Sequence, residues 1–319
     1  MKAAVYNSYG PPHVVALADL EIPVPKPDEI LIRVRATTVN RTDTGIRSAV
    51  YVVSRLFSGI IRPKFPVLGN EFAGDVVSTG EKVKEFKEGD RVFGYNDTSF
   101  GGHAEYLTIR ENDAIDHIPD NLSYREAAPL TEGAHYALCN IRAARVKAGQ
   151  NVMVYGATGA IGSAAVQLLH YFGAHVTAVC HTKHVELVAS LGADRVVDYV
   201  SEDFTATDRR FDFVFDAVGK ISFGQCKRIL NPEGIYVSTE PGKNGENIYL
   251  ALIKKFSTGK RVIFPIPSIS KHDVTFLGEL AKKGIFKPVI DRSYRLDEIV
   301  EAHQYVETGQ KTGNVVILP

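Results

Sequence analysis

The sequence contains few cysteines and no excess of charge of either sign. Only Cys139, Cys180 and Cys226 occur in 319 residues, and their odd number and wide spacing exclude a disulfide framework and a CxxC metal-binding pair. Such sparse use of cysteine fits a reducing compartment. The 37 basic residues balance the 37 acidic residues, and no basic tract indicates binding of nucleic acid.

Long apolar segments are also missing. The first residues, MKAAVYNSYGPPH, contain too short an apolar run for a signal peptide. No stretch approaches the roughly 20 apolar residues of a membrane-spanning helix. With 45% apolar and 23% charged residues, the composition is that of an ordinary globular enzyme. We therefore expect a soluble, cytoplasmic protein without membrane partners, and its length suggests two domains.

The most informative stretch is NVMVYGATGAIGSAAVQLLHYF, residues 151–172. A β-branched apolar run opens it and apolar residues at helical spacing close it, with Gly156, Gly159 and Gly162 between them. A strand, a glycine turn and a helix in this order form a phosphate cradle, because the turn and the helix N-terminus expose backbone N–H groups. The spacing GxxGxxG departs from GxGxxG, but its context predicts a dinucleotide site. We assign to the cradle Gly156, Thr158, Gly159, Ala160, Ile161 and Gly162.

The end of the next strand, residues 174–180, distinguishes NAD(H) from NADP(H). An NAD site usually has an acidic residue there, about 20 residues past the glycines. Here the chain continues as CHTKH, and no carboxylate appears before Glu186. A hydroxyl and a lysine would bind the 2′-phosphate that an acidic residue would repel. The sequence therefore predicts NADP(H), with Thr182 and Lys183 as its contacts.

Two textures divide the chain. Residues 1–122 contain short strands punctuated by proline and glycine, which is typical of an antiparallel, barrel-like domain. Residues 123–284 alternate strand and helix, which predicts an α/β Rossmann domain with a doubly wound parallel sheet. Here we expect a helix over 223–230 and a turn over 231–234. Residues 285–319 return to strand texture.

The sheet topology adds further candidate cofactor contacts. Ligands of doubly wound sheets bind beyond the carboxyl ends of the parallel strands. Besides Thr182 and Lys183, this rule selects Tyr199, Val218, Gly219 and Thr239.

Residues 49–61, AVYVVSRLFSGII, interrupt the barrel texture. Their apolar side chains share one face of a helix. Such a helix packs on a core, covers a hydrophobic substrate mouth as a lid, or lies on a membrane surface. Its scarcity of basic residues disfavours the membrane surface.

Ordered motifs along the whole chain resemble those of the medium-chain dehydrogenase/reductase superfamily, in its zinc-independent quinone oxidoreductase-like branch. The matching segments are MKAAVYNSYGPP, VRATTVNRTDTGIRSAVY, PVLGNEFAGDVVSTGEKVKEFKEGDRVFG, YGATGAIG, SLGADRVVDY, FDFVFDAVG and EAHQYVETGQKTGNVVI. The resemblance implies a GroES-like catalytic domain at residues 1–122, to which residues 285–319 return. It also implies a nucleotide-binding domain at residues 123–284.

The resemblance also bears on metal binding. Zinc enzymes of this superfamily have a cysteine at the position of Asn40, a histidine at that of Asn70 and a second cysteine near Leu130 and Thr131. Asparagine is a poor zinc ligand, and the one nearby carboxylate, Glu71, does not make a site. We therefore expect no metal.

Without a metal, the resemblance implies hydride transfer from NADPH to a small apolar quinone or α,β-unsaturated carbonyl compound. Reduction of such an acceptor gives a delocalised anion, which needs only hydrogen-bond donors and a proton. The resemblance places Asn40 near the nicotinamide and Tyr51 at the pocket. For Asn40 a structural turn role, and for Tyr51 core packing, remain alternatives.

The same resemblance places Lys311 or Asn314 near the cofactor. Two other functions remain open, namely an NADP-dependent alcohol or aldehyde dehydrogenase and a non-catalytic NADPH-binding protein. The strand at 261–265 is a candidate pairing edge for a homodimer.

Overall fold

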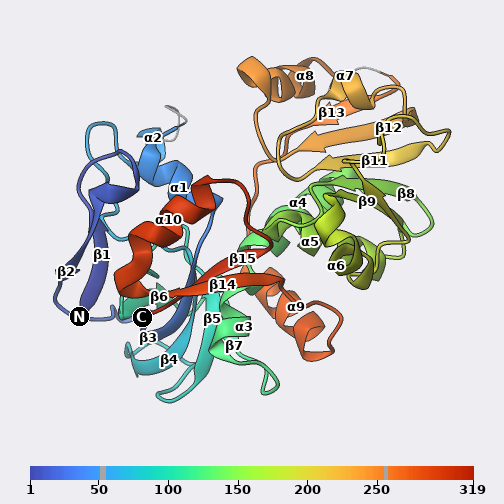
Figure 1. Cartoon of the computed structure of the whole chain (residues 1–319). Coiled ribbons are helices and arrows are strands. Elements are labelled where there is room, and N and C mark those ends of the chain that lie inside the picture. Colours follow the sequence, from blue (N-terminus) through green and yellow to red (C-terminus); the bar gives the residue numbers. More distant parts are fainter. Residues whose placement is uncertain (51–54, 255–257) are drawn as a thin grey trace. The chain divides into compact units, whose positions relative to one another are not determined.

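The computed structural model describes residues 1–50, 55–254 and 258–319, which form two compact units (Figure 1). Unit 1 comprises Met1–Glu132 and Ile269–Pro319, and unit 2 comprises Gly133–Ser268. None of the helices in the described ranges has the length and hydropathy of a membrane-spanning segment.

Unit 1 is built around a seven-stranded sheet in the order β14-β15-β3-β4-β5-β7, with β6 also paired to β3. Its strands are β3 (Glu29–Val39), β4 (Glu71–Thr79), β5 (Arg91–Tyr95), β6 (Tyr106–Arg110), β7 (Ile115–His117), β14 (Ile290–Arg295) and β15 (Asn314–Leu318). Strands β14 and β15 pair in parallel, and β3 pairs antiparallel with β4, β6 and β15. A separate antiparallel pair joins β1 (Lys2–Tyr6) and β2 (Val15–Asp19). The antiparallel, GroES-like part of the predicted fold is confirmed.

Strand β3 lies at the centre of this sheet and leads to the candidate site. Along its 11 residues only Arg33 and Arg35 are exposed. Ile30 and Ile32 pack in a core cluster with Phe72 of β4. The strand ends immediately before the helix α1 (Arg41–Ser48), so a buried strand and a helix fix the residues at the junction.

Helices from two stretches that the sequence assigned to the nucleotide-binding domain pack within unit 1. Residues 123–132 include α3 (Tyr124–Ala127), which contacts β3 and β4. Residues 269–284 include α9 (Lys271–Lys282), which contacts β7. The other elements of unit 1 are η1 (Pro12–Val14), α2 (Arg55–Ser58), η3 (Ala128–Leu130), η6 (Leu296–Glu298) and α10 (Ile299–Glu307).

Unit 2 contains a six-stranded parallel sheet in the order β10-β9-β8-β11-β12-β13 (Figure 1). The strands are β8 (Asn151–Tyr155), β9 (His175–Cys180), β10 (Arg195–Asp198), β11 (Phe211–Asp216), β12 (Leu230–Ser238) and β13 (Arg261–Ile263). Counted from β8, this is the order 3-2-1-4-5-6 of the doubly wound dinucleotide-binding fold. The helices are α4 (Glu132–Ala144), α5 (Ala160–Tyr171), η4 (Thr182–His184), α6 (Val185–Ser190), α7 (Phe223–Cys226), η5 (Lys243–Gly245) and α8 (Glu246–Lys254). The first residue of α4, Glu132, still belongs to unit 1. The predicted Rossmann sheet is confirmed.

One connection in unit 2 differs from the sequence prediction. The helix expected over 223–230 ends at Cys226, and β12 already begins at Leu230. Residues 231–234, predicted as a turn, form a bulge in β12, where they lie opposite the single residue Asp212 of β11. The pairs on either side of the bulge, Leu230 with Phe211 and Ile235 with Phe213, keep these residues within the strand.

The single helix predicted for residues 49–61 is also wrong. Helix α1 ends before Ala49, whose φ of 50° is left-handed. The next helix, α2, covers four residues and is followed by Gly59 with φ 117°. A right-handed helix cannot pass through either position.

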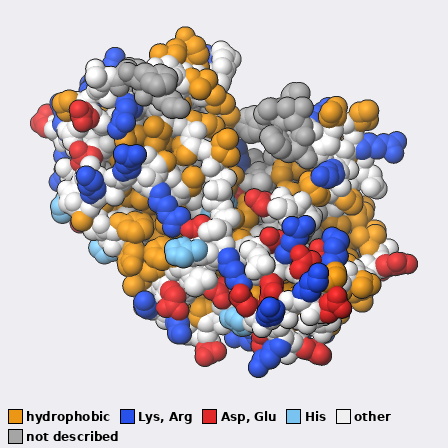
Figure 2. Space-filling model, turned by 180° about the vertical axis from the view of Figure 1, so that it is seen from behind, with side chains coloured by type: hydrophobic (Ala, Val, Ile, Leu, Met, Phe, Trp, Pro, Cys, Tyr) orange, Lys and Arg blue, Asp and Glu red, His pale blue; other side chains and the backbone are white. Residues whose placement is uncertain are grey.

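Charged side chains of both signs are mixed over the face of the molecule seen in Figure 2, in keeping with the zero net charge. Exposed apolar side chains gather on α8, where Ile248, Tyr249, Leu252 and Ile253 are all exposed.

Candidate functional site

The turn between β8 and α5 and the first turn of α5 contain three glycines with different structural roles. Gly156 has φ 78°, and a Cβ there would lie 2.6 Å from the Val218 side chain. A Cβ on Gly162 would lie 2.1 Å from the carbonyl oxygen of Gly156. Both positions therefore require glycine so that the turn closes against α5 and the neighbouring loop.

Gly159 differs from these two glycines, because neither its backbone conformation nor a close contact requires the absence of a side chain. It is the N-cap of α5 in an extended conformation, and the nearest atom to a Cβ placed there is 3.9 Å away. No side chain caps the helix. The first N–H groups of α5, from Ala160 to Gly162, lack intrahelical acceptors and carry partial positive charge. The start of α5 is thus open to a phosphate group, so the chain fits a dinucleotide here.

The predicted contacts for the 2′-phosphate lie beside an acidic residue that sequence reasoning missed. Thr182, at the start of η4, donates its hydroxyl to Asp198 Oδ2 at 2.7 Å. Asp198 ends β10, the strand next to β9. The hydrogen bond from Thr182 lowers the pKa of Asp198, so its carboxylate stays charged. Lys183 follows with an exposed side chain. The sequence signal that could have revealed this contact is the acidic residue Asp198 at the end of the predicted strand β10.

Aromatic side chains flank this edge of the sheet. Tyr199 directly follows β10, and its ring stacks at 6.3 Å from that of Tyr155, at the end of β8. The ring of His181 meets Tyr199 edge-on at 5.7 Å. His181 Nδ1 also accepts the N–H of Lys183 at 3.3 Å, so this histidine caps η4. Tyr199 therefore lies on the strand-end edge that topology predicted.

Asp216 organises the loop after β11 and was also missed. It is fully buried, and its Oδ1 accepts backbone N–H groups of Val218 and Gly219 at 3.2 and 2.9 Å. Its backbone carbonyl accepts the N–H of Thr239 at 3.1 Å. Burial raises the pKa of Asp216, while its hydrogen bonds oppose that shift. Val218 and Gly219 are thus held by the carboxyl group of Asp216 and Thr239 by its backbone carbonyl, and all three are predicted cofactor contacts.

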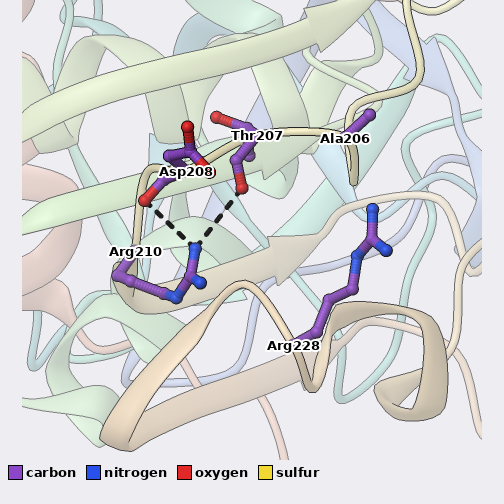
Figure 3. A pocket seen from close by; sticks show the side chains of 5 residues that line it. All are labelled: Ala206, Thr207, Asp208, Arg210 and Arg228. Atoms are coloured by element: carbon purple, nitrogen blue, oxygen red, sulfur yellow. Dashed lines mark hydrogen bonds between the residues drawn. The ribbon is translucent and has the colours of Figure 1, made fainter.

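A hollow of about 370 Å³ in unit 2 lies elsewhere (Figure 3). Arg210, which lines it, directs its guanidinium to the backbone carbonyls of Thr207 and Asp208 at 3.3 and 3.0 Å. Arg210 immediately precedes β11, and Arg228 lies shortly before β12. The hollow thus belongs to the amino ends of the strands, opposite the edge where dinucleotides bind.

In unit 1, Asn40 is the N-cap of α1. Its Oδ1 accepts the N–H of Asp43 at 3.0 Å, and its own N–H donates to Asp43 Oδ2 at 3.1 Å. Its Nδ2 donates to Asn70 Oδ1 at 2.7 Å. Asn40 therefore fills the structural turn role that the sequence left open. Tyr51, the other predicted catalytic residue, lies outside the described residues, as does Val53 of the proposed lid.

Asn70 extends this network to two further side chains. Its Nδ2 donates to the Tyr95 hydroxyl at 3.0 Å and to Glu132 Oε2 at 3.3 Å. The three segments at which the resemblance places zinc ligands therefore do meet in space, joined by hydrogen bonds. Among the described residues no group of three or more His, Cys, Asp or Glu side chains is arranged to hold a metal ion.

Glu71 and Glu132 are buried carboxyl groups within this network. Glu71 accepts Thr38 Oγ1 at 2.6 Å, Thr131 Oγ1 at 2.9 Å and two backbone N–H groups. Glu132 Oε1 accepts Thr42 Oγ1 at 2.6 Å. Burial and the neighbouring Glu71 raise the pKa of Glu132 to about 8. No local sequence pattern marks Glu132, which is 62 residues from its partner Asn70.

Lys311 and Asn314 belong to unit 1, whereas the other predicted cofactor contacts belong to unit 2. Burial lowers the pKa of Lys311 to about 8, and its ammonium donates to the carbonyl of Gly313. Asn314 donates its side-chain amide to the carbonyl of Val289 at 3.0 Å. The structure thus gives Asn314 a role in fixing β15.

Two family models match the chain, and several known proteins are similar to it. Residues 26–120 match the alcohol dehydrogenase GroES-like domain, and residues 191–317 match the zinc-binding dehydrogenase family. The chain is 32% identical over 338 residues to the chloroplast envelope quinone oxidoreductase homolog of Arabidopsis thaliana, covering 100% of this chain and 98% of the relative.

A second relative and a solved structure are also similar to the chain over its whole length. The chain is 32% identical over 338 residues to the chloroplastic NADPH-dependent alkenal/one oxidoreductase of Arabidopsis thaliana, covering 100% of this chain and 80% of the relative. The quinone oxidoreductase from Coxiella burnetii superposes with a TM-score of 0.88 at 29% identity, covering 100% of this chain and 99% of that chain.

Proposed function

Because the chain is an oxidoreductase that belongs to the medium-chain dehydrogenase/reductase superfamily, in its quinone oxidoreductase-like branch, we propose that it uses NADPH to reduce a small apolar quinone or α,β-unsaturated carbonyl compound. The nicotinamide, when bound, supplies the hydride. The observation that carries the proposal is the uncapped start of α5, which the glycine turn leaves open to a pyrophosphate.

The residues of unit 1 suit an acceptor that delocalises charge. Reduction of a simple ketone gives a localised alkoxide, which needs a Lewis acid or a matched proton donor. A reduced quinone or enone needs only hydrogen-bond donors and a proton. The Asn40 amide has two N–H groups. One donates to Asn70 Oδ1 at 2.7 Å and the other makes only a long bond of 3.5 Å to Thr38 Oγ1, so the second is the candidate donor to the acceptor. Tyr51 is the second candidate.

We propose NADP(H) rather than NAD(H) as the cofactor. Lys183 presents an exposed ammonium beside the strand-end edge, and Thr182 adjoins it. Asp198 opposes this preference, because its carboxylate already holds the Thr182 hydroxyl. The relative named as an NADPH-dependent alkenal/one oxidoreductase supports NADPH. Of the residues in unit 1, Lys311 remains the candidate contact, whereas the amide of Asn314 is already engaged.

Oxidation of NADPH with an ortho-quinone and with an enone, and reduction of NADP⁺ with primary alcohols, should be measured in parallel. The proposal predicts turnover of quinone or enone. Turnover of alcohols alone, or cofactor binding without any turnover, would contradict it. Gly159→Asp is the control variant, because its carboxylate would stand at the start of α5 and repel the pyrophosphate while the backbone conformation suits any residue.

We also propose a cytoplasmic homodimer without nucleic-acid or membrane partners. Strand β13 is an edge strand of the six-stranded sheet. Helix α8 packs against β13 and also presents exposed apolar side chains. An open edge beside an apolar helix face suits pairing with a second copy. The measurement is the mass of the particle in solution by light scattering, for which a monomer would contradict the proposal.

A further inference from the structure

Two carboxyl groups are buried next to each other in unit 1. Glu71 is fully buried in β4, and Glu132, the first residue of α4, is 4% exposed. The backbone N–H of Glu132 donates to Glu71 Oε1 at 2.6 Å, so the two residues are in direct contact. Adjacent carboxylates away from water repel each other strongly, which disfavours ionisation of both.

The charged groups around this pair do not compensate two negative charges. Asp43 of α1 adds a further carboxyl group, Tyr95 of β5 contributes a neutral hydroxyl, and Lys311 is the cation within electrostatic reach of both glutamates. Burial lowers the pKa of Lys311 to about 8, so even this charge is weakened. Arg41 also acts electrostatically on Lys311, and His103 lies 3.8 Å from Asp43. The mutual repulsion of the carboxyl groups nevertheless favours retention of a proton on one of them.

Hydrogen bonds identify the carboxyl group that keeps the proton. Burial raises the pKa of Glu71, but its hydrogen bonds oppose that shift, and two of its four donors are backbone N–H groups, which can never accept. The bonds of Glu71 therefore suit the ionised form. Glu132 Oε2 accepts an N–H of Asn70 at 3.3 Å, but the Glu132 side chain also faces the hydroxyls of Thr42 and Tyr95, which can accept an O–H bond as well as donate. The 2.6 Å separation of Thr42 Oγ1 and Glu132 Oε1 suits a bond in either direction.

We propose that Glu132 holds a proton at neutral pH and delivers it through the hydroxyl of Thr42 to the anion formed on the reduced acceptor. The inference rests on the proposed function, which generates that anion. Thr42 is half-buried in the first turn of α1, two residues after Asn40, and thus connects the buried acid with the exterior of unit 1.

The transfer conserves atoms and charge. The hydroxyl hydrogen of Thr42 moves as a proton to the acceptor anion, while the O–H bond of Glu132 breaks and its proton moves to Thr42 Oγ1. Glu132 is left as a carboxylate, and solvent water returns a proton to it through the same hydroxyl before the next turnover. The acceptor gains one hydride and one proton, and the nicotinamide is the group oxidised.

The first test is the pH dependence of kcat at saturating NADPH and acceptor. In the wild type kcat should fall above a pH of about 8, where Glu132 loses its proton. Glu132→Gln keeps the size of the side chain but cannot titrate, so kcat should drop about tenfold or more and no longer fall in that range. Glu88→Gln, on an exposed residue, is the control and should behave as the wild type. An unchanged profile in Glu132→Gln would overturn the inference.

Variants of Thr42 and Lys311 separate this role from a structural one. Thr42→Val should lose as much kcat as Glu132→Gln, and Thr42→Ser should restore it. The double variant should be no slower than either single variant, because the two residues act in series. In Lys311→Met the fall in kcat should move to higher pH, because a positive charge near Glu132 is lost. If kcat of Lys311→Met no longer falls at high pH, the fall in the wild type comes from titration of the lysine, and the inference is overturned.

A readout without turnover distinguishes failure of this inference from failure of the proposed function. Difference infrared spectra between pH values below and above about 8 should show loss of a carboxylic acid carbonyl band in the wild type, and Glu132→Gln should lack the band. Absence of the band in the wild type would overturn the proton on Glu132 whatever the activity. A wild type that shows the band but reduces neither quinone nor enone would contradict the proposed function, and the relay with it.

Discussion

The side-chain amide of Asn40 donates to the side-chain oxygen of Asn70 across 2.7 Å, between the start of α1 and the residue before β4. Both amides are buried, and Asn70 passes the connection on to Tyr95 and Glu132. The bond joins two of the positions at which the resemblance to zinc enzymes places metal ligands. Two amides that satisfy each other thus hold together segments that a metal would otherwise link.

Asn40→Ala should reduce the free energy of unfolding by about 2–4 kcal/mol. About 1 kcal/mol comes from loss of the N-cap on α1, and the rest comes from the Asn70 oxygen left buried without its donor. Urea unfolding measures the effect. Asn121→Ala, whose exposed amide makes one long bond to the Lys282 carbonyl, should change stability by less than about 0.5 kcal/mol. Equal stability of the two variants would contradict the structural role of Asn40.

Local signals were enough to predict the nucleotide-binding half of the fold. The glycine turn at 156–162 combines a strand, a turn and a helix within a short stretch, and the sheet order follows from repeated βα units. Periodicity failed where backbone conformation decided the outcome. The pattern over 49–61 has helical spacing, but Ala49 and Gly59 adopt positive φ, which periodicity does not report. Family recognition from ordered motifs is confirmed by the relatives.

The candidate site was harder to predict than the fold because its contacts join distant residues. Asn70 and Glu132 are 62 residues apart, and Thr42 and Glu132 are 90 apart. No periodic pattern marks such pairs. Asp216 carried a signal that went unused, since an acidic residue ending a buried strand in FDFVFD needs partners. For Asn40 both roles were considered, and only the structure shows its amide bound to Asn70.

The stability of the protein should fall as the pH drops below about 6.5, through His303 of α10. Both ring nitrogens of His303 are buried without a partner, and its ring meets that of His103 edge-on at 5.7 Å. Burial, with His103 and Arg47 nearby, lowers the pKa of His303 well below its usual value. Below its ordinary pKa, His303 therefore binds a proton in the unfolded chain but stays neutral in the folded chain. This contribution to stability is complete above the ordinary pKa and is lost as the pH falls below it.

The change to be measured is the slope of unfolding free energy against pH in urea. His303→Leu should flatten the acid side by up to about 1.4 kcal/mol per pH unit. His13→Leu, on an exposed histidine, is the control and should keep the wild-type slope. If both variants follow the wild type, His303 does not contribute to acid sensitivity.

Two glycines of the turn should respond in opposite ways to the same added methyl group. Gly162→Ala places a Cβ 2.1 Å from the Gly156 carbonyl, so the turn must deform and stability should fall by about 2 kcal/mol or more. Gly159→Ala meets no atom closer than 3.9 Å and should leave thermal stability nearly unchanged. Its methyl group would instead occupy the approach of the pyrophosphate, so NADPH affinity should fall. Thermal unfolding and fluorescence titration with NADPH measure the two effects. A stable Gly159→Ala that binds NADPH as tightly as the wild type would place the pyrophosphate elsewhere.

Lys183 and Asp198 should affect the choice between NADPH and NADH in opposite directions. Lys183→Ala should weaken NADPH binding by roughly 1.5–3 kcal/mol, the scale of a charged hydrogen bond, and leave NADH nearly unchanged. Asp198→Asn removes a carboxylate from the end of β10 and keeps an oxygen to accept the Thr182 hydroxyl. A 2′-phosphate would then lose a repelling charge, so NADPH should bind more tightly while NADH does not. The ratio of the two dissociation constants is the quantity to measure, because a general loss of structure would weaken both cofactors alike. Equal losses for both cofactors in Lys183→Ala, with no gain in Asp198→Asn, would mean that the 2′-phosphate is bound elsewhere.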